Sequence, residues 1–397
     1  MMTNMSKMKH ILKRAAAGAL ALAMCAGLTG CYSEDKAWAA KMGEDTMPIG
    51  GYIYYLSSAY SQGSALVENG QEVLKNTIEG QNASQWIQDK ALEQLKSFYF
   101  VQQKFDEMGL ALDEEDQENI TNASNSMWSY YKTAFEAVGV AQSSFTRAYA
   151  EYNIKLQKVM QAMYGEGGER ALTEDEMHDY YTENYIYYNY FYVPFSTTDE
   201  EGQSKTMEED EQAQVKEALR EHVKSISSGD ETLEQASAAY VAEGSSKPTL
   251  GEASAINKNN LSEQFSEALT GLKDGESAMV DMSSGAYVLQ KMNIETDYQA
   301  LINDETRKEG LIAEMKGEEF TEYVKEQSAS VNLDLNEKAI GSVKLSLVAE
   351  TLGKNGTSSA SSQEEESSSS ESSSSESSSS ESSEASSEES SEESSEA

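Results

Sequence analysis

Apolar side chains recur through the first half of the chain with the period of an amphipathic helix. Between residues 82 and 109 they fall on one helical face, and Gly109 follows as a stop signal. The members of this stripe are Trp86, Ile87, Ala91, Leu92, Leu95, Phe98, Tyr99 and Phe105. Two further stripes, from Ile120 to Phe135 and from Ser143 to Gly165, have the same period. The pattern predicts helices whose apolar faces form a core.

The helical pattern begins after a short polar stretch. Thr46 is placed to cap the first helix, with Pro48 in its first turn. We therefore predict a linker over residues 31–45 and the first part of a helical domain over residues 46–184.

The periodicity changes near residue 173. Thr173 and Glu176 have the spacing of a capping box, which predicts a short helix. The following segment, "IYYNYFYVPF", is rich in aromatic and β-branched residues and reads as a strand. The elements predicted after it are helices over residues 205–226, 231–242 and 261–272, and two short strands around Val280 and Tyr287.

This order predicts a small α/β domain over residues 186–295, inserted into the helical domain. A helical pattern returns after it, so residues 297–350 are assigned to the second part of the helical domain. The fold class expected for the whole chain is α+β and mainly helical.

The N-terminus carries a separate signal. Lys7, Lys9, Lys13 and Arg14 precede an apolar stretch over residues 15–27, which is too short to span a bilayer. "LTGC" at residues 28–31 then resembles the bacterial lipobox. The resemblance implies a lipoprotein signal peptide over residues 1–30 and lipid attachment at Cys31. It also implies an extracytoplasmic protein anchored to the cell membrane, and with the C-terminal tail it suggests a Gram-positive envelope.

Cysteine usage follows from that cleavage. Cys25 lies in the signal peptide and Cys31 carries the lipid, so no thiol remains in the mature chain. Disulfides, thiol catalysis and cysteine-ligated metals are thereby excluded.

Charge narrows the range of partners. The formal net charge of the chain is −39. When the 12 Glu of residues 357–397 and the four cations before residue 15 are left out, a charge of −31 remains on residues 31–356. Such a surface repels phosphate backbones, so no nucleic-acid partner is expected. Residues 357–397 also hold 24 Ser and no aromatic residue, a composition that predicts a disordered tail.

Part of the inserted domain resembles the parvulin type of peptidyl-prolyl isomerase. The resemblance covers "LEQASAAYVAEGSSKPTLG" and "FSEALTGLKDGES", with a glycine-bearing strand about ten residues later. Together with the lipobox and the flanking helices, the chain from Cys31 to about residue 350 resembles PrsA-like foldase lipoproteins and SurA-like chaperones.

The resemblance implies a set of site residues. Leu261 and Phe265 match the apolar residues that grip the proline ring. Tyr190 and Tyr287 stand where the family has a pair of histidines, and Glu243 falls near its third polar position. Because the imidazole pair is missing, weak or absent isomerase activity is expected.

The histidines of the mature chain do not suggest another chemistry. His178 and His222 fall in predicted helices and lack metal-ligand spacing, so neither a metal nor a cofactor is expected.

Three functions remain open at this point. The first is a membrane-anchored chaperone or foldase that binds unfolded exported polypeptides through a degenerate parvulin-like domain. The second is an active peptidyl-prolyl isomerase, and the third is a lipid-anchored binding or envelope-spacing protein.

Overall fold

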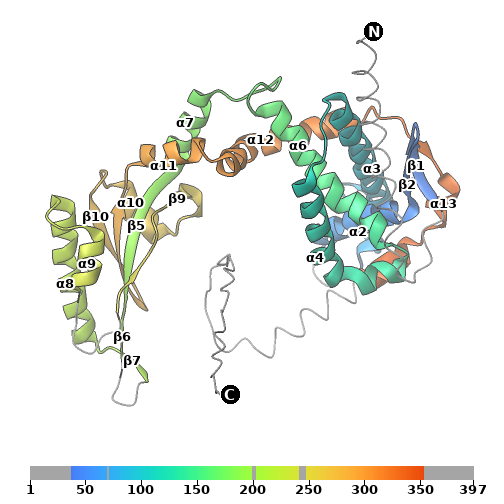
Figure 1. Cartoon of the computed structure of the whole chain (residues 1–397). Helices are drawn as coiled ribbons and strands as arrows, with labels where there is room; N and C mark the ends of the chain where they lie inside the picture. The colour runs from blue at the N-terminus through green and yellow to red at the C-terminus, as the bar shows by residue number, and fades with distance from the viewer. Residues whose placement is uncertain (1–36, 69–70, 199–202, 241–246, 353–397) are drawn as a thin grey trace, which may run out of the picture.

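The computed structural model describes residues 37–68, 71–198, 203–240 and 247–352. The chain is α+β and mainly helical, as the sequence predicted. Figure 1 shows an arch in which a helical body forms one end and a sheet domain the other, with α7, α11 and α12 between them. Cys31, the predicted site of lipid attachment, and the Ser/Glu tail lie outside the described residues.

No helix in the described ranges combines the length and the apolar character needed to cross a bilayer.

The helical body is built on three long segments. They are α2 (Ile49–Ala65), α3 (Ala83–Glu107) and α4 (Glu114–Val138). A fourth segment runs from α5 (Gln142–Phe145) through the π-helical turn η2 (Thr146–Glu151) into α6 (Tyr152–Tyr164). Shorter pieces between α2 and α3 are η1 (Val73–Lys75), β3 (Thr77–Ile78) and β4 (Gln81–Asn82).

Local signals in the sequence explain where these helices begin and end. The Asn82 side chain accepts hydrogen bonds from the first backbone N–H groups of α3, and Asp113 forms a capping box with Asp116 at the start of α4. Gly109 and Gly139 have positive φ angles of 68° and 92°, which glycine adopts without a steric penalty. The first of these helices therefore stops where the sequence predicted, and Gly139 ends the second in the same way.

The linker predicted over residues 31–45 is wrong from residue 38 onward. Strands β1 (Trp38–Met42) and β2 (Asp45–Pro48) form a hairpin there. The Tyr99 hydroxyl fastens this hairpin to α3, because it donates to the Ala40 carbonyl at 2.8 Å and accepts from the Met47 amide at 2.9 Å. Thr46 consequently lies in a strand, and the N-cap of α2 is Pro48.

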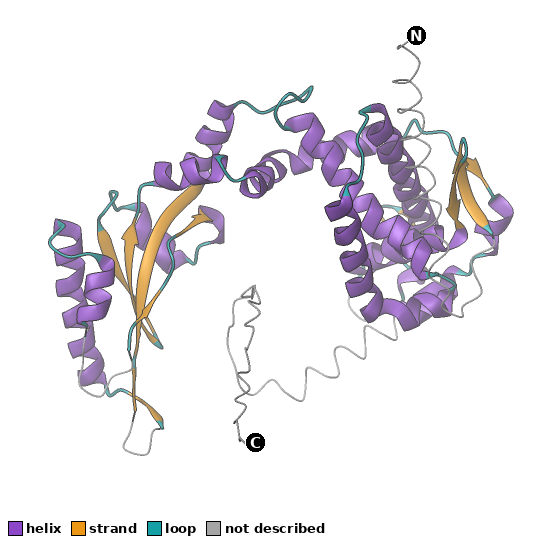
Figure 2. Ribbon diagram, in the orientation of Figure 1, coloured by secondary structure: helices purple, strands orange, loops and turns teal. Residues whose placement is uncertain are grey.

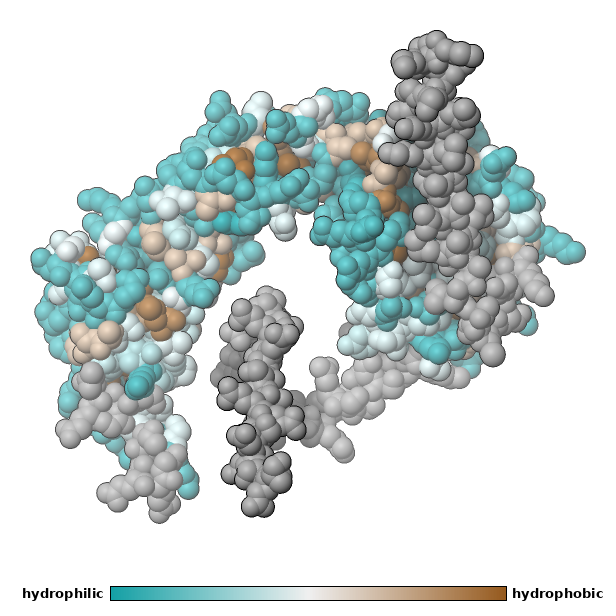
Figure 3. Space-filling model, viewed as in Figure 1, coloured by the Kyte–Doolittle hydropathy of each residue, from teal (hydrophilic) through white to brown (hydrophobic). Residues whose placement is uncertain are grey.

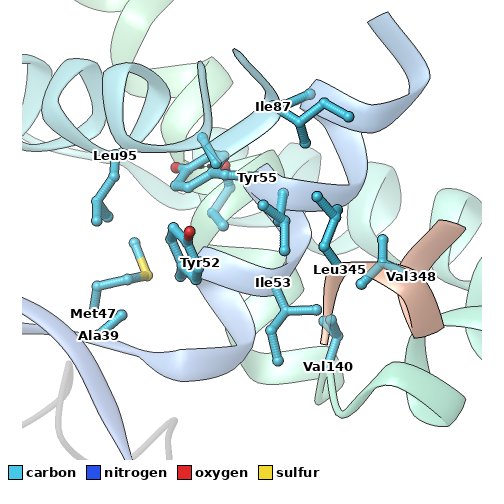
Figure 4. Packing of buried hydrophobic residues seen from close by; sticks show 14 of the residues in the cluster. Ala39, Met47, Tyr52, Ile53, Tyr55, Ile87, Leu95, Val140, Leu345 and Val348 are labelled. Atoms are coloured by element: carbon cyan, nitrogen blue, oxygen red, sulfur yellow. Dashed lines mark hydrogen bonds between the residues drawn. The ribbon is translucent and has the colours of Figure 1, made fainter. Parts of the chain in front are cut away.

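The end of the described chain returns to the helical body. Strand β12 (Asp334–Leu335) pairs with β1 in an antiparallel ladder, and α13 (Glu337–Ser342) packs near α2. Leu345 and Val348 then lie beside Ile53 and Val140 in the buried core (Figure 4). Residues from both sides of the inserted segment thus share one core.

The sheet domain has a five-stranded antiparallel sheet around β5 (Tyr185–Pro194). Its other strands are β8 (Thr249–Leu250), β9 (Ser254–Asn257), β10 (Ser277–Met282) and β11 (Gly285–Lys291). Helices α8 (Glu209–Ser228) and α9 (Leu233–Ala239) cover one face, and α10 (Glu263–Thr270), preceded by η3 (Lys258–Asn260), covers the other.

Two details of this domain differ from the sequence prediction. The helix expected from residue 205 begins at Glu209, because residues before it form the hairpin of β6 (Ser196–Thr198) and β7 (Ser204–Thr206). Strands β8 and β9 lie between the helices predicted over residues 231–242 and 261–272, where no strand was predicted. Both are short and pair with β5, so their stability depends on the partner strand and not on their own sequence.

Three helices join the two ends of the arch. They are α7 (Glu174–Asn184), α11 (Ile294–Ile302) and α12 (Glu305–Ser328), and they share a second core with α3 and α6. The Glu314 carboxylate of α12 accepts hydrogen bonds from Tyr180 at 2.9 Å, from Asn257 at 2.7 Å and from Tyr185. One carboxylate therefore links α12 to α7 and to two strands of the sheet.

Candidate functional site

The two faces of the sheet are set by alternation along β5. Phe191, Val193 and Phe195 are buried beneath α8 and α9, whereas Ile186, Tyr188 and Tyr190 face α10. Strand β11 alternates in the same way, with Val288 on the first face and Tyr287 on the second. Because Tyr287 is paired with Tyr192 in the ladder, the aromatic side chains of the two strands lie next to one another.

Five rings form what we call the aromatic cluster: Tyr188, Tyr190, Tyr192, Phe265 and Tyr287. The Tyr287 ring is central, with centroids 4.6 Å from Tyr192, 5.1 Å from Phe265 and 5.6 Å from Tyr190. Phe265 packs edge-on to both Tyr287 and Tyr188, the geometry that ring quadrupoles favour. The cluster extends the core to the surface, since Tyr188 is buried and the other four are half-buried.

Helix α10 supplies the Phe265 ring because of a local capping signal. The Ser262 hydroxyl accepts from the Phe265 amide at 3.4 Å, which starts the helix directly after Leu261. Leu269, one turn beyond Phe265, is fully buried and holds the helix on the sheet. Leu261 and Phe265 both pack against the core that contains Tyr190 and Tyr287.

The structure thus brings together four of the five site residues that the sequence predicted. Tyr190, Tyr287, Leu261 and Phe265 lie on one face of the sheet domain. Glu243 is outside the described residues. Sequence reasoning missed Tyr188 and Tyr192, although the tyrosines at every second position of "YIYYNYFY" carry the signal for a shared face.

Gly251 positions the Tyr190 side chain. Its amide donates to the Tyr190 carbonyl at 2.8 Å, and a Cβ atom at Gly251 would lie only 2.4 Å from the Tyr190 ring. The "TLG" segment at residues 249–251 therefore supports the cluster by allowing close backbone approach.

Burial keeps the hydroxyls of Tyr188 and Tyr287 protonated at physiological pH, because it raises the pKa of both. Burial raises the pKa of Tyr287 above its ordinary value, and the neighbouring Tyr192 and Tyr190 add to the shift. Tyr192 donates to the Ser284 carbonyl at 2.8 Å. Within the described ranges, the Tyr190 and Tyr287 hydroxyls have no hydrogen-bond partner, so both are free to bind a ligand.

Both histidines lie apart from this cluster. His178 is on α7 and pairs with Glu295 at 2.9 Å, whereas His222 is on α8, across the sheet, and pairs with Glu231 at 2.8 Å. The described residues also contain no grouping of three metal-ligating side chains. The cluster itself therefore offers aromatic surface and phenol hydroxyls, a combination suited to gripping apolar side chains beside a polar backbone.

The fold and this site define an α+β protein with a helical body and a projecting sheet domain. No family model and no curated protein matches the chain. Solved structures similar to it include the foldase protein PrsA from Lactococcus lactis, at 13% identity and a TM-score of 0.34 over 80% of this chain and 99% of that one. PrsA from Streptococcus pneumoniae is similar at 14% identity and a TM-score of 0.30 over 77% and 98%.

A SurA-like chaperone structure described for PEB4 and Cj1289 of Campylobacter jejuni is similar as well, at 10% identity and a TM-score of 0.25 over 76% and 99% of the two chains. These are the classes of protein that the sequence resembles. These identities and TM-scores are too low to assign a function, so any function has to be inferred from the residues of this chain.

Proposed function

We propose that this protein is an extracytoplasmic chaperone or foldase that binds unfolded exported polypeptides close to a membrane. The observation that carries the proposal is the aromatic cluster, in which half-buried rings lie beside the free hydroxyls of Tyr190 and Tyr287. Unfolded chains expose apolar side chains next to backbone amides. A surface that offers rings and hydroxyls together suits both features.

The strength expected of such contacts is modest. Burying one large apolar side chain contributes about 1.5–3 kcal/mol, which gives weak and quickly reversible binding at a single site. That behaviour suits a chaperone, because clients of varied sequence must be released to fold. Figure 3 shows further apolar residues on a mostly hydrophilic surface of the sheet domain.

The same residues favour the binding of polypeptide over catalysis of isomerisation. Rotation about a peptide bond has a barrier of about 18–20 kcal/mol, and an isomerase lowers it by binding the twisted amide more tightly than the planar one. Leu261 and Phe265 supply an apolar grip for a proline ring. Tyr190 and Tyr287 supply phenols in place of an imidazole pair, so we expect binding to exceed turnover.

Membrane attachment through Cys31 is the second part of the proposal. Its support is the charged segment, the short apolar segment and the "LTGC" sequence. Two acyl chains on one cysteine give stable anchoring, whereas one chain binds only marginally. The acidic surface would not itself attract anionic lipids, so the lipid on Cys31 must make the contact.

An aggregation assay with a chemically denatured reporter tests the chaperone role. We expect the purified protein to slow aggregation of the reporter at stoichiometric concentrations. A protein that leaves the aggregation rate unchanged would be a spacer or a binding protein of another kind.

Active isomerisation is the second candidate, favoured by the two free hydroxyls beside the apolar grip. A proline-peptide isomerisation assay separates the two functions. We expect activity far below that of a parvulin that has the histidine pair. Fast isomerisation that collapses in Tyr287→Phe would instead assign the chemistry to the Tyr287 hydroxyl.

A further inference from the structure

A second candidate binding site lies in the helical body, away from the aromatic cluster. A cavity of about 260 Å³ opens between α2, α3 and the segment from η2 to α6. Its lining includes four tyrosines, Tyr54, Tyr55, Tyr149 and Tyr152. The rest of the lining is small or polar, and consists of Ser58, Gln94, Ser97, Ala148 and Asn153.

The π-helical turn η2 forms part of this cavity. A π turn widens the helix and interrupts the regular hydrogen-bond ladder, and such turns occur often at functional sites. The Tyr55 hydroxyl from α2 donates to the Ala148 carbonyl within this turn at 3.1 Å. The turn also brings Tyr149 into contact with Tyr54 at 6.2 Å between ring centroids.

The rings of the cavity are held rigidly by their neighbours. Phe145 contacts Tyr54 at 5.3 Å and stacks on Tyr149 at 5.1 Å between centroids. Burial raises the pKa of Tyr152 to about 12, so this side chain is a neutral phenol. Burial also raises the pKa of Tyr54, and the neighbouring Tyr149 raises it further. The cavity is therefore preorganised, and Tyr54 and Tyr152 are uncharged.

Several polar groups of the cavity have no hydrogen-bond partner among the described residues. In the part of the chain that the structure describes, the hydroxyls of Tyr54, Tyr149 and Tyr152 accept or donate no hydrogen bond. The same holds for the side-chain amides of Gln94 and Asn153. Gln94 and the three tyrosines are half-buried, whereas Asn153 is exposed, so a ligand can form hydrogen bonds with each of these groups.

We propose that this cavity binds a single aromatic side chain of an unfolded polypeptide, with Gln94 and Asn153 bonding to the adjacent peptide backbone. The volume is below the roughly 300–1,000 Å³ of pockets for drug-sized ligands, so it suits one side chain. An aromatic occupant gains edge-on ring contacts worth about 0.5–1.5 kcal/mol beyond its buried area. No cation lines the cavity, so an anionic ligand would find no counter-charge.

This inference rests on the proposed function in one respect, since it takes unfolded polypeptide as the ligand. It adds a second site on a different part of the molecule. A long client that reaches both sites would bind with an effective concentration set by the intervening chain, and would therefore bind more tightly than a short peptide.

The test uses a short fluorescent peptide of Gly, Ser and Lys with one Tyr, and a twin in which that Tyr is Ala. Binding is measured by fluorescence anisotropy to the full chain carrying Phe265→Ala, which weakens the aromatic cluster. In this background we compare Ser58→Leu, which fills the cavity, with Ser61→Leu. Ser61 is an exposed residue of the same helix that does not line the cavity.

We expect the Tyr peptide to bind at least tenfold more tightly than its Ala twin, and Ser58→Leu to abolish that difference while Ser61→Leu preserves it. Equal binding of the two peptides, or unchanged binding by Ser58→Leu, would overturn the cavity proposal. Circular dichroism confirms that both variants are folded. The suppression of reporter aggregation is measured in a separate assay with the protein that carries no substitution. The chaperone proposal can therefore hold even if the cavity proposal fails.

A photoreactive version of the Tyr peptide gives a measurement that needs no variant. A benzophenone placed next to the Tyr should label residues of α2 or α6 near the cavity. Labelling confined to the sheet domain would contradict the proposal.

Discussion

Ala40 of β1 lies opposite Leu335 of β12 in an antiparallel ladder. These residues come from the two ends of the described chain, and the sheet domain lies between them in the sequence. Each strand of this pairing is short, so the ladder depends on packing against the helical body. The contact therefore ties the segment after the sheet domain to the segment before it.

If the backbone is cleaved between the N-terminal helices and the later elements, the two fragments should remain associated. Gly167 lies in an exposed turn after α6, and a protease site inserted beside it would separate β1 and α2–α6 from all later elements. We expect the two fragments to co-elute from a size-exclusion column, because α12 packs on α3 and α6 and Leu345 enters the first core. Fragments that separate without denaturant would contradict the inserted-domain architecture.

A methyl group at Gly251 should disturb the aromatic cluster. Its Cβ would lie 2.4 Å from the Tyr190 ring, so Gly251→Ala must displace that ring or the strand. We expect a loss of about 1–3 kcal/mol in the unfolding free energy of the sheet domain, followed by near-UV circular dichroism in urea. Gly271→Ala is the matched control, since a Cβ there meets no atom within 4 Å. Equal effects of the two changes would refute this packing.

The contact between α7 and α11 should depend on pH. The hydrogen bond to Glu295 raises the pKa of His178 above its ordinary value, and the charges of Glu295 and Asp179 add to this, whereas desolvation opposes it. Tyr298 contacts the imidazole edge-on. Because the pKa of His178 is higher in the folded state than in the unfolded state, protonation of His178 stabilises the fold. This stabilisation is complete below the unfolded-state pKa of about 6.5 and is lost as the pH rises through the folded-state pKa.

His178→Asn should accordingly lower the melting temperature more at about pH 5.5 than at about pH 9. Differential scanning fluorimetry measures the two differences. Glu295→Gln should flatten the pH dependence in the same way. A His178→Asn effect of the same size at both pH values would show that the pair makes no charge-dependent contribution.

Replacing Cys31 by Ala should remove the protein from the membrane fraction. The thiol is the only acylation site that signal-peptide cleavage would leave in the sequence. We expect release into the medium or accumulation of uncleaved precursor, visible by fractionation and immunoblotting. Unchanged retention that requires detergent would contradict the lipoprotein assignment.

Local sequence signals predicted the long helices and the central strand. The capping box of Thr173 and Glu176 forms as expected, with a 2.8 Å hydrogen bond from the Thr173 amide to the Glu176 carboxylate. The aromatic density of β5 indicated a strand because its side chains alternate between two buried faces. These features depend on residues that are near one another in the chain.

The features that sequence reasoning missed depend on distant partners. β1 and β12 carry little strand signal of their own, and each becomes a strand only by pairing. The cavity was missed for a similar reason, since Tyr149 and Tyr152 follow the helical stripe of ordinary core residues. Only the packing of three helices shows that they line a space.

Whether the aromatic cluster binds unfolded polypeptide can be tested by measuring the affinity of a permanently unfolded protein for the Phe265→Ala variant. Gln264→Ala, at the adjacent exposed position of α10, is the control, and Tyr287→Phe reports on the hydroxyl alone. We predict that Phe265→Ala weakens binding about tenfold or more, corresponding to the loss of the apolar contacts of one ring. Gln264→Ala should bind as the unaltered protein does, and Tyr287→Phe, which keeps its ring, should weaken binding less than Phe265→Ala. Undiminished binding by a folded Phe265→Ala variant would show that the aromatic cluster is not the binding site.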